Sequence, residues 1–187
     1  MRTALYGGTF DPIHHGHLIL AREAMEQLGL DRVVFIPTAV SPFKQGTAPA
    51  PADARLAMVR AAIAGEPRFE CDDSELGRGG PSYTVDTVDA WRARAPGDEL
   101  FYFIGQDNVR DLAAWKRWEE LRAKATFVVF ERAEPPAHGF PAVRRRVDVS
   151  ATEVRKRVAE GRSIRYLVPE AVREIIETRQ LYKGDHH

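Results

Sequence analysis

The stretch that decides the fold is residues 1–17, MRTALYGGTFDPIHHGH. It begins with a short apolar run of strand character over residues 3–6, which two glycines end. Residues 9–12 then form a turn, and residues 14–17 open an amphipathic helix. Glycines let the backbone approach a ligand closely, and a helix N-terminus offers N–H groups and the positive end of the helix dipole. This order of strand, turn and helix predicts a phosphate site.

Two histidines of this stretch, His14 and His17, are three residues apart, so both side chains project from one side of the first helical turn. Imidazole donates hydrogen bonds at neutral pH and gains charge beside a polyanion, so we interpret the pair as phosphate ligands. The alternatives are two solvated histidines at a helix start, or a zinc pair. No nearby cysteine or third histidine completes a closed zinc site, and His15 is expected to point elsewhere.

The longer string over residues 7–18, GGTFDPIHHGHL, resembles the bacterial nicotinate-mononucleotide adenylyltransferases of the HxGH nucleotidylyltransferase superfamily. The resemblance implies adenylyl transfer from ATP to nicotinate mononucleotide, giving deamido-NAD and pyrophosphate, in NAD biosynthesis. It also implies that His17 is the α-phosphate ligand and His14 a second phosphate contact. The turn residues implied to present backbone groups to the substrates are Gly7, Gly8, Thr9 and Phe10. The ring of Phe10 is expected in the core, and Asp11 is expected to orient the loop or cap the helix.

A second motif lies near the C-terminus, over residues 149–155, VSATEVR. It resembles the family pattern Ile-Ser-Ser-Thr-x-x-Arg, although Ala151 replaces the second serine. The resemblance implies that Ser150 and Thr152 hold the β- and γ-phosphates of ATP and that Arg155 adds charge-assisted hydrogen bonds. Taken alone, the same residues are a capping box that opens an ordinary surface helix. The functional interpretation therefore requires that Arg155 and the N-terminal motif share one crevice.

The acceptor side is implied by residues 81–87, PSYTVDT, which resemble the family segment that meets the pyridine nucleotide. Thr84 is implied to bond the carboxylate or amide of the pyridine ring. Trp115 falls where the family has a tryptophan that stacks on this ring. Because Trp115 and Trp118 are at helical spacing, a core stripe is the alternative, and we adopt it only for Trp118.

Two further positions follow from the resemblance. The segment FIGQD over residues 103–107 looks like the family Gly-x-Asp, with Gly105 in the ATP site and Asp107 near the ribose or the metal–phosphate region. Lys44 lies in a loop of the family type Pro-Pro-His-Lys and is implied to reach phosphate, although Phe43 stands where the family usually has histidine. Mg²⁺ is implied as the cofactor, bound mainly through the substrate phosphates.

The rest of the chain alternates between strand and helix patterns, which predicts an α/β fold with a Rossmann-like, doubly wound, mainly parallel sheet and helices on both faces. The expected strands are residues 3–6, 33–36, 68–71, 100–104, 126–130 and 147–149. The expected helices are residues 14–28, 52–64, 82–94, 112–125, 151–160 and 169–178. Irregular segments are expected at residues 39–51, 72–81 and 131–146. Ligands then belong at the carboxyl ends of the strands.

Composition narrows the class of protein. The 187 residues, 44% of them hydrophobic, predict a single domain over residues 1–187, whose C-terminal helical part from about residue 150 carries the second phosphate motif. The 27 basic and 27 acidic residues cancel, so charge gives no argument for a nucleic-acid or membrane partner. The single cysteine, Cys71, and the lack of a signal peptide or membrane-length apolar run lead us to expect a cytoplasmic protein.

Several alternatives stay open at the level of sequence. Pantetheine-phosphate adenylyltransferases and cytidylyltransferases share the HxGH half, and a non-catalytic nucleotide-binding module is an alternative from another class. The small-molecule substrates ATP and nicotinate mononucleotide are the expected partners, and a homo-oligomer is compatible with the sequence. Preference for the nicotinate or the nicotinamide mononucleotide is not decided. His186 and His187 are left out of the functional interpretation.

Overall fold

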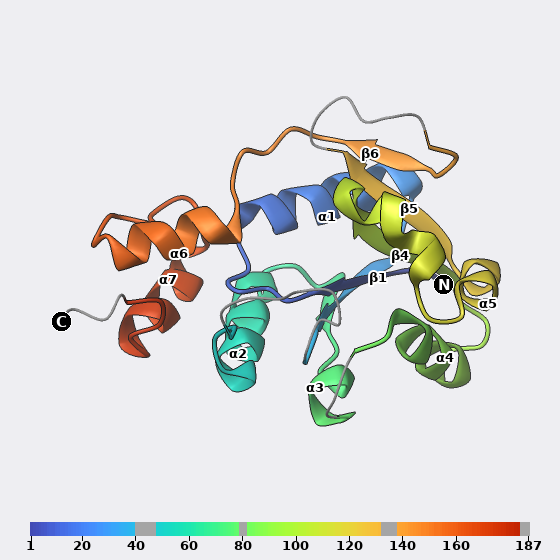
Figure 1. Ribbon diagram of the computed structural model, residues 1–187, viewed down its shortest axis with the longest axis horizontal. Coiled ribbons are helices and arrows are strands. Elements are labelled where there is room, and N and C mark those ends of the chain that lie inside the picture. The colour runs from blue at the N-terminus through green and yellow to red at the C-terminus, as the bar shows by residue number, and fades with distance from the viewer. Residues whose placement is uncertain (40–47, 79–81, 132–137, 184–187) are drawn as a thin grey trace.

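Within residues 1–39, 48–78, 82–131 and 138–183, which the computed structural model describes, six strands form one parallel sheet. The strand order is β3-β2-β1-β4-β5-β6 (Figure 1). The strands are β1 Arg2–Gly8, β2 Arg32–Pro37, β3 Phe69–Cys71, β4 Glu99–Gly105, β5 Thr126–Glu131 and β6 Ala142–Arg144. All neighbouring strands pair in parallel, which confirms the predicted Rossmann-like fold class.

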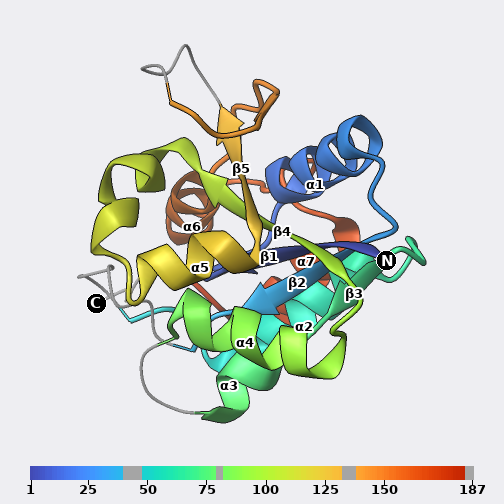
Figure 2. The same cartoon turned by 90° about the vertical axis from the view of Figure 1, so that its right-hand side faces the viewer.

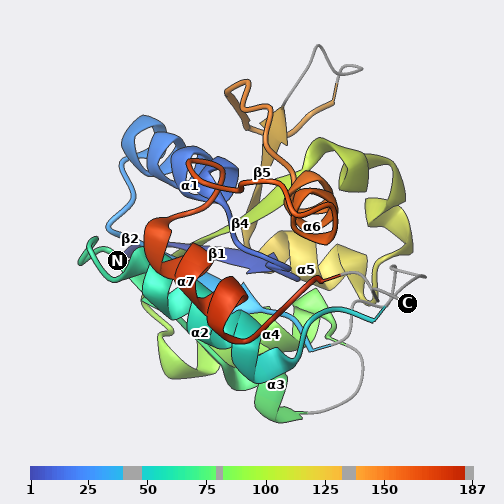
Figure 3. The same cartoon turned by 90° about the vertical axis from the view of Figure 1, so that its left-hand side faces the viewer.

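Helices cover both faces of this sheet. They are α1 His15–Leu28, α2 Ala52–Ile63, α3 Ser74–Arg78, α4 Thr84–Arg94, the 3₁₀ helix η1 Gln106–Ala114, α5 Trp118–Lys124, α6 Ala151–Ala159 and α7 Glu170–Thr178. Helices α4 and α5 pack with η1 on one face, in front in Figure 2. Helices α1, α2, α6 and α7 pack on the other face, toward the viewer in Figure 3. The C-terminal helices therefore share a core with the sheet.

The central strand β1 is buried on both faces, because helices cover both sides of the sheet. Ala4 and Tyr6 lie in the core beneath α1 and α2, whereas Leu5 between them lies in the core beneath α4. The side chains of Ala4 and Leu5 are fully buried. This burial fixes the register of β1 and so fixes where its two terminal glycines emerge.

The carboxyl ends of the strands form the edge at which ligand is expected. Gly8 at the end of β1 pairs with Pro37 at the end of β2. The pairing of β1 with β4 ends earlier, at Leu5 and Tyr102. The strand order changes direction between β1 and β4, and open α/β sheets bind ligands at such a switch point. The glycine turn of the first motif leaves the sheet at this point.

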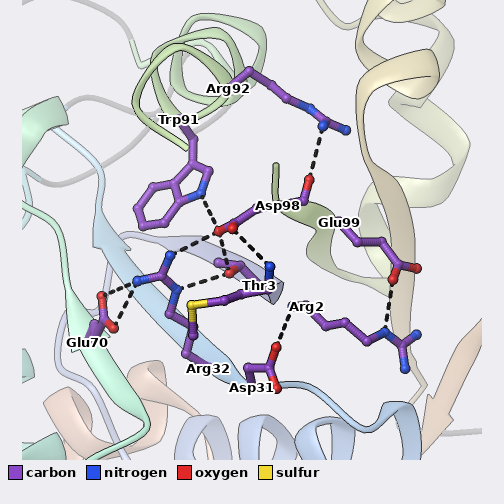
Figure 4. Close-up of polar contacts among 10 residues, drawn as sticks. Arg2, Thr3, Asp31, Arg32, Glu70, Trp91, Arg92, Asp98 and Glu99 are labelled. Atoms are coloured by element: carbon purple, nitrogen blue, oxygen red, sulfur yellow. Dashed lines mark hydrogen bonds and ion pairs between the residues drawn. The ribbon is translucent and has the colours of Figure 1, made fainter. Parts of the chain in front are cut away.

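The opposite edge of the sheet is closed by a polar cluster around Asp98 (Figure 4). Asp98 accepts hydrogen bonds from Thr3 Oγ1 at 2.8 Å and from Arg32 Nη2 at 2.9 Å. It also accepts from the Met1 amine at 3.2 Å and from Trp91 Nε1 at 3.4 Å. Burial opposes ionisation of this carboxyl, but the four donors outweigh burial and hold the pKa of Asp98 well below its usual range. The cluster fixes the amino ends of the strands, away from the candidate site.

Local signals in the sequence place several helix ends. Gly29 ends α1 with φ of 58°, in the left-handed conformation that glycine adopts without strain. Ser150 is the N-cap of α6, and its hydroxyl accepts a hydrogen bond from the Glu153 N–H at 3.1 Å. Pro169, predicted as the first helical residue, is instead the N-cap of α7.

The predicted continuous helix over residues 112–125 is wrong. Helix η1 ends at Ala114, α5 begins at Trp118, and Arg117 just before α5 has φ of 54°. A residue in the left-handed region cannot continue a right-handed helix. Trp115 consequently lies in a bend between two helices.

Two short segments also differ from the prediction. Residues 72–81, predicted as a loop, contain α3, which buries the side chain of Glu75. The predicted strand at residues 147–149 is irregular, and the edge strand is β6, which buries Val143 against the sheet. Both segments bury one side chain, and a single buried position leaves no periodic pattern in a sequence.

Candidate active site

The two predicted phosphate histidines form a stacked pair at the start of α1. His14 is the N-cap residue, His17 follows three residues later, and their ring centroids lie 3.8 Å apart. The His14 backbone N–H donates to His17 Nδ1 at 3.2 Å. Because Nδ1 accepts this hydrogen bond, the neutral His17 ring carries its proton on Nε2. The ring is therefore set to donate through Nε2.

Gly16, between the two histidines, is a site residue that the sequence analysis did not single out. A Cβ atom at this position would lie 2.9 Å from both Cε1 and Nδ1 of His14, and 3.4 Å from the Val149 carbonyl oxygen. A side chain here would displace the His14 ring. The signal was available, because the motif itself carries a glycine between its histidines.

Phe10 supports the histidine pair from below. Its ring is buried and lies edge-on to His17, with the ring centroids 5.1 Å apart. A Cβ atom at Gly8 would come within 2.9 Å of this ring, which explains the glycine there. The Phe10 backbone has φ of 45°, a left-handed conformation that is uncommon outside glycine. The expectation that the ring belongs to the core is confirmed, and the substrate contacts of the backbone stay a prediction.

The second phosphate motif meets the first. Arg155 Nη1 donates to the Asp11 backbone carbonyl at 2.7 Å, across 144 residues of sequence. Arg155 Nη2 lies 3.4 Å from Thr152 Oγ1 in the same motif. Gly16, whose added Cβ would touch the Val149 carbonyl, gives an independent contact between the two segments. The two segments therefore meet at Asp11 and Gly16, and a crevice shared by Arg155 and the N-terminal motif stays a prediction.

Asp11 and Arg55 organise this junction. Asp11 was expected to orient the loop or cap the helix, whereas no role was predicted for Arg55. The Asp11 carboxylate accepts from the Tyr182 hydroxyl at 2.7 Å and from the Ala50 N–H at 3.0 Å. Arg55 is 1% exposed and donates to three carbonyl oxygens. These belong to Thr9 at 2.7 Å, Thr38 at 2.9 Å and Ala50 at 3.0 Å. Burial lowers the pKa of Arg55, which the nearby Asp11 opposes. An arginine in an alanine-rich helix gives no sign of this role.

The two predicted pyridine-binding residues come together on the face of the sheet that α4 covers, opposite the face that α1 covers. Thr84 and Trp115 line one small hollow, together with Tyr83 and Lys116. Thr84 Oγ1 lies 3.4 Å from the hydroxyl of Tyr102, whose pKa is raised by burial. The Trp115 ring also packs nearly perpendicular to the core residue Phe127, with the ring centroids 6.2 Å apart. Trp115 therefore lines the hollow and packs against the core.

The remaining predicted residues take separate positions. Gly105 ends β4, and Asp107 follows it as an exposed carboxylate in the first turn of η1. Lys44 and Phe43 lie outside the described residues. Cys71 is the last residue of β3, and burial raises its pKa to about 11, so it stays a thiol at neutral pH.

Two larger hollows, each about 470 Å³, lie away from this edge and contain none of the predicted site residues. The first lies between α6 and α7, where Arg162 and Arg173 are already paired with glutamates of their own segments. The second lies beside α5 and β5. Among the helices of the described ranges, none has the length and apolar character that crossing a bilayer requires.

The chain is similar to known proteins along almost its full length. A family model described as cytidylyltransferase-like matches residues 5–157. Relatives from Thermus thermophilus and Rubrobacter xylanophilus are each named probable nicotinate-nucleotide adenylyltransferase. The first is 47% identical over 98% of this chain and 100% of its own length. The second is 44% identical over 99% of this chain and 94% of its own length.

The fold is also similar to a solved structure, that of Plasmodium falciparum nicotinic acid mononucleotide adenylyltransferase complexed with NaAD. The TM-score is 0.78, and the match covers 97% of this chain and 97% of the other. The sequence identity is 18%, so this likeness concerns the fold.

Proposed function

The chain belongs to the nicotinate-nucleotide adenylyltransferase family of cytidylyltransferase-like proteins, and we propose that it transfers the adenylyl group of ATP to nicotinate mononucleotide. The products are nicotinate adenine dinucleotide and pyrophosphate, so the reaction is a step of NAD biosynthesis. The observation that carries this proposal is the junction of the two phosphate motifs, in which Arg155 donates to the backbone of Asp11.

In the proposed reaction one substrate attacks the other directly, and the protein forms no covalent bond to either. An oxygen of the mononucleotide phosphate attacks the α-phosphorus of ATP, and the bond to the leaving pyrophosphate breaks. Because the attacking phosphate is already an anion, no general base is required. Catalysis then rests on in-line positioning and on donors aimed at the charge of the transferring and leaving groups. We expect no covalent enzyme intermediate.

We assign the α-phosphate of ATP to His17 and a second phosphate contact to His14. The Nε2–H of His17, set by the hydrogen bond at its Nδ1, supports this assignment. The same proposal gives the β- and γ-phosphates to Ser150, Thr152 and Arg155. The N-terminus of α6, which Ser150 caps, supports it because its N–H groups and dipole favour an anion.

We propose that the acceptor binds beside Thr84 and Trp115, which line a hollow of about 20 Å³. This hollow has room for about one water, so the pyridine ring would lie over it and not inside it. We propose that Thr84 bonds the substituent of the pyridine ring and that Trp115 stacks on the ring itself. A flat, electron-poor ring suits stacking on indole. This arrangement favours the pyridine acceptor over that of the pantetheine-phosphate enzymes, because it supplies a stacking partner and a hydroxyl within one small space.

Mg²⁺ fits the site as an ion held mainly through the phosphates of ATP. It keeps several waters and needs one or two carboxylates in addition to substrate oxygens. Asp107 is an exposed carboxylate at the carboxyl end of β4 and would serve as such a ligand. When bound, the ion neutralises charge that develops on the pyrophosphate. We also propose that the protein is cytoplasmic. That it forms a homo-oligomer stays a prediction, which light scattering can test.

The function is tested by pyrophosphate release from ATP and nicotinate mononucleotide with the purified protein. His17→Ala is expected to lower kcat by about 100- to 1,000-fold, the usual cost of one preorganised donor. His15→Ala is the matched control, because this variant keeps the backbone N–H that His15 donates to the Leu167 carbonyl at 3.0 Å. A wild-type protein that releases no pyrophosphate would refute the function. Full activity in His17→Ala, with an unchanged circular dichroism spectrum, would remove His17 from the mechanism.

A further inference from the structure

The segment after α7 takes an unusual path that brings Tyr182 to Asp11, in the turn between β1 and α1. Gln180 has φ of 54° and Tyr182 has φ of 60°, both in the left-handed region that non-glycine residues rarely adopt. Between them, the Leu181 N–H donates to the Ile176 carbonyl at 3.0 Å, which closes the end of the helix. Such backbone conformations cost free energy and persist where surrounding contacts require them. The contact that results here joins the Tyr182 hydroxyl to Asp11 Oδ1 at 2.7 Å.

Asp11 connects Tyr182 to a proposed ATP ligand. The Asp11 residue is 8% exposed, and its Oδ1 also accepts from the Ala50 N–H at 3.0 Å. Its backbone carbonyl accepts from Arg155 Nη1 at 2.7 Å, and its Oδ2 lies 3.8 Å from the same nitrogen. Rotation of the Asp11 side chain therefore moves the carboxylate oxygen that faces the Arg155 guanidinium, whereas the backbone carbonyl keeps its place.

Tyr182 is suited to act only as a donor in this arrangement. Burial raises the pKa of Tyr182 well above its usual value, and the hydrogen bond to the Asp11 carboxylate raises it further. The phenol therefore keeps its proton throughout the working pH range. Its hydroxyl fixes one oxygen of Asp11 and leaves the other turned toward Arg155.

We propose that Tyr182 is a positioning residue for the adenylyl transfer, acting through Asp11 to hold the Arg155 guanidinium in place for the phosphates of ATP. This inference rests on the proposed function. It differs from a purely structural role of Tyr182, in which the hydroxyl only secures the C-terminal segment. The two roles predict different dependence on Arg155, because a structural contact acts whether or not the guanidinium is present.

The test is a double-mutant cycle with Tyr182→Phe and Arg155→Ala. The dissociation constant for ATP with Mg²⁺ is measured by calorimetry without acceptor, and KM for each substrate is measured by pyrophosphate release. Tyr182→Phe should raise the ATP dissociation constant by about 10-fold, within the range of coupling inside one hydrogen-bonded network, and leave KM for the mononucleotide unchanged. In the Arg155→Ala background the same change should alter ATP binding by less than about twofold. Tyr166→Phe is the matched control, since the Tyr166 side chain is exposed.

Equal losses of ATP affinity in the two backgrounds would overturn the proposal, as would an unchanged ATP affinity in Tyr182→Phe. If Tyr182→Phe does not fold, Asp11→Asn carries the same cycle, because it weakens the acceptor of Tyr182 and removes the charge 3.8 Å from Arg155 Nη1, while the backbone carbonyl that accepts from Arg155 is kept. A protein that binds ATP but releases no pyrophosphate would refute the proposed reaction, while the binding cycle still decides the role of Tyr182. A protein that binds no ATP would refute both.

Discussion

Gly16→Ala separates the geometry of the histidine pair from the stability of α1. The added Cβ would lie 2.9 Å from two atoms of the His14 ring, so the ring must shift or rotate away. The Val149 carbonyl oxygen, 3.4 Å from the added Cβ, leaves the new methyl group little room to move away from the ring. Since His14 and His17 are stacked at 3.8 Å, displacement of one ring disturbs the other.

The expected loss of stability in Gly16→Ala is smaller than the expected loss of transition-state stabilisation. Helix propensity favours alanine by up to about 1 kcal/mol, whereas overpacking costs about 1–3 kcal/mol. The net loss of stability is then about 0–2 kcal/mol, which lowers Tm by at most about 8 °C for a chain of this size. Misplacement of a catalytic group by about 1 Å costs about 100-fold in rate, equivalent to about 2.7 kcal/mol.

We therefore expect Gly16→Ala to lose about 100-fold in kcat/KM while it remains folded at assay temperature. The assay is pyrophosphate release, with thermal melts followed by circular dichroism. Gly77→Ala is the matched control, because Gly77 lies in helix α3 and an added Cβ there meets nothing within 4 Å. Activity of Gly16→Ala within about threefold of wild type, or an equal loss in Gly77→Ala, would refute the reasoning.

Three further predictions concern stability, the acceptor and the metal. Asp98→Asn should lower the free energy of unfolding by about 2–4 kcal/mol at pH 7, whereas the exposed control Asp111→Asn should change it by less than about 0.5 kcal/mol, both by urea denaturation. Because the pKa of folded Asp98 is lowered, its stabilisation is complete above about pH 4 and is lost as pH falls further; a wild-type Tm that falls no faster than that of the variant between about pH 5 and pH 3 would contradict this. Trp115→Ala should raise KM for nicotinate mononucleotide by about 3- to 10-fold and leave KM for ATP unchanged, and a shift in ATP alone would exclude stacking on the pyridine. Removal of divalent ions with EDTA should abolish pyrophosphate release and added Mg²⁺ should restore it, and activity that persists in EDTA would rule out the metal.

The elements that could be predicted are those whose burial repeats along the chain. Strand β1 and helix α1 each have an apolar period that matches their geometry, and Gly29 and Ser150 mark helix ends through local hydrogen bonds. The predictions failed where one residue broke a periodic pattern. The expected helix is interrupted by the extended backbone of Trp115 and the left-handed backbone of Arg117, and β6 and α3 are too short to show a period.

The candidate site also contains residues that could be predicted from the sequence and residues that could not. His14 and His17 could be paired from their spacing, and the glycines before them from the turn that they form. Thr84 and Trp115 were proposed from resemblance, and the fold brings them to one hollow. The roles of Arg55 and Tyr182 could not be predicted, because neither residue lies in a motif and most of their partners are distant in sequence.

The alternation of strands and helices apart from α3, β6 and the break before α5, the glycine turn and the positions of both phosphate motifs follow from the amino-acid sequence alone. All of these depend on residues within about one helical turn of each other or on a repeating apolar face. Only the packed chain shows that Asp11 accepts hydrogen bonds from Arg155, 144 residues away in the sequence, and from Tyr182, 171 residues away. Such contacts form because buried carbonyl and carboxylate oxygens need donors, and whichever donors the packed chain brings within reach satisfy them. That requirement has no sequence spacing, so only the fold could identify the residues that meet it.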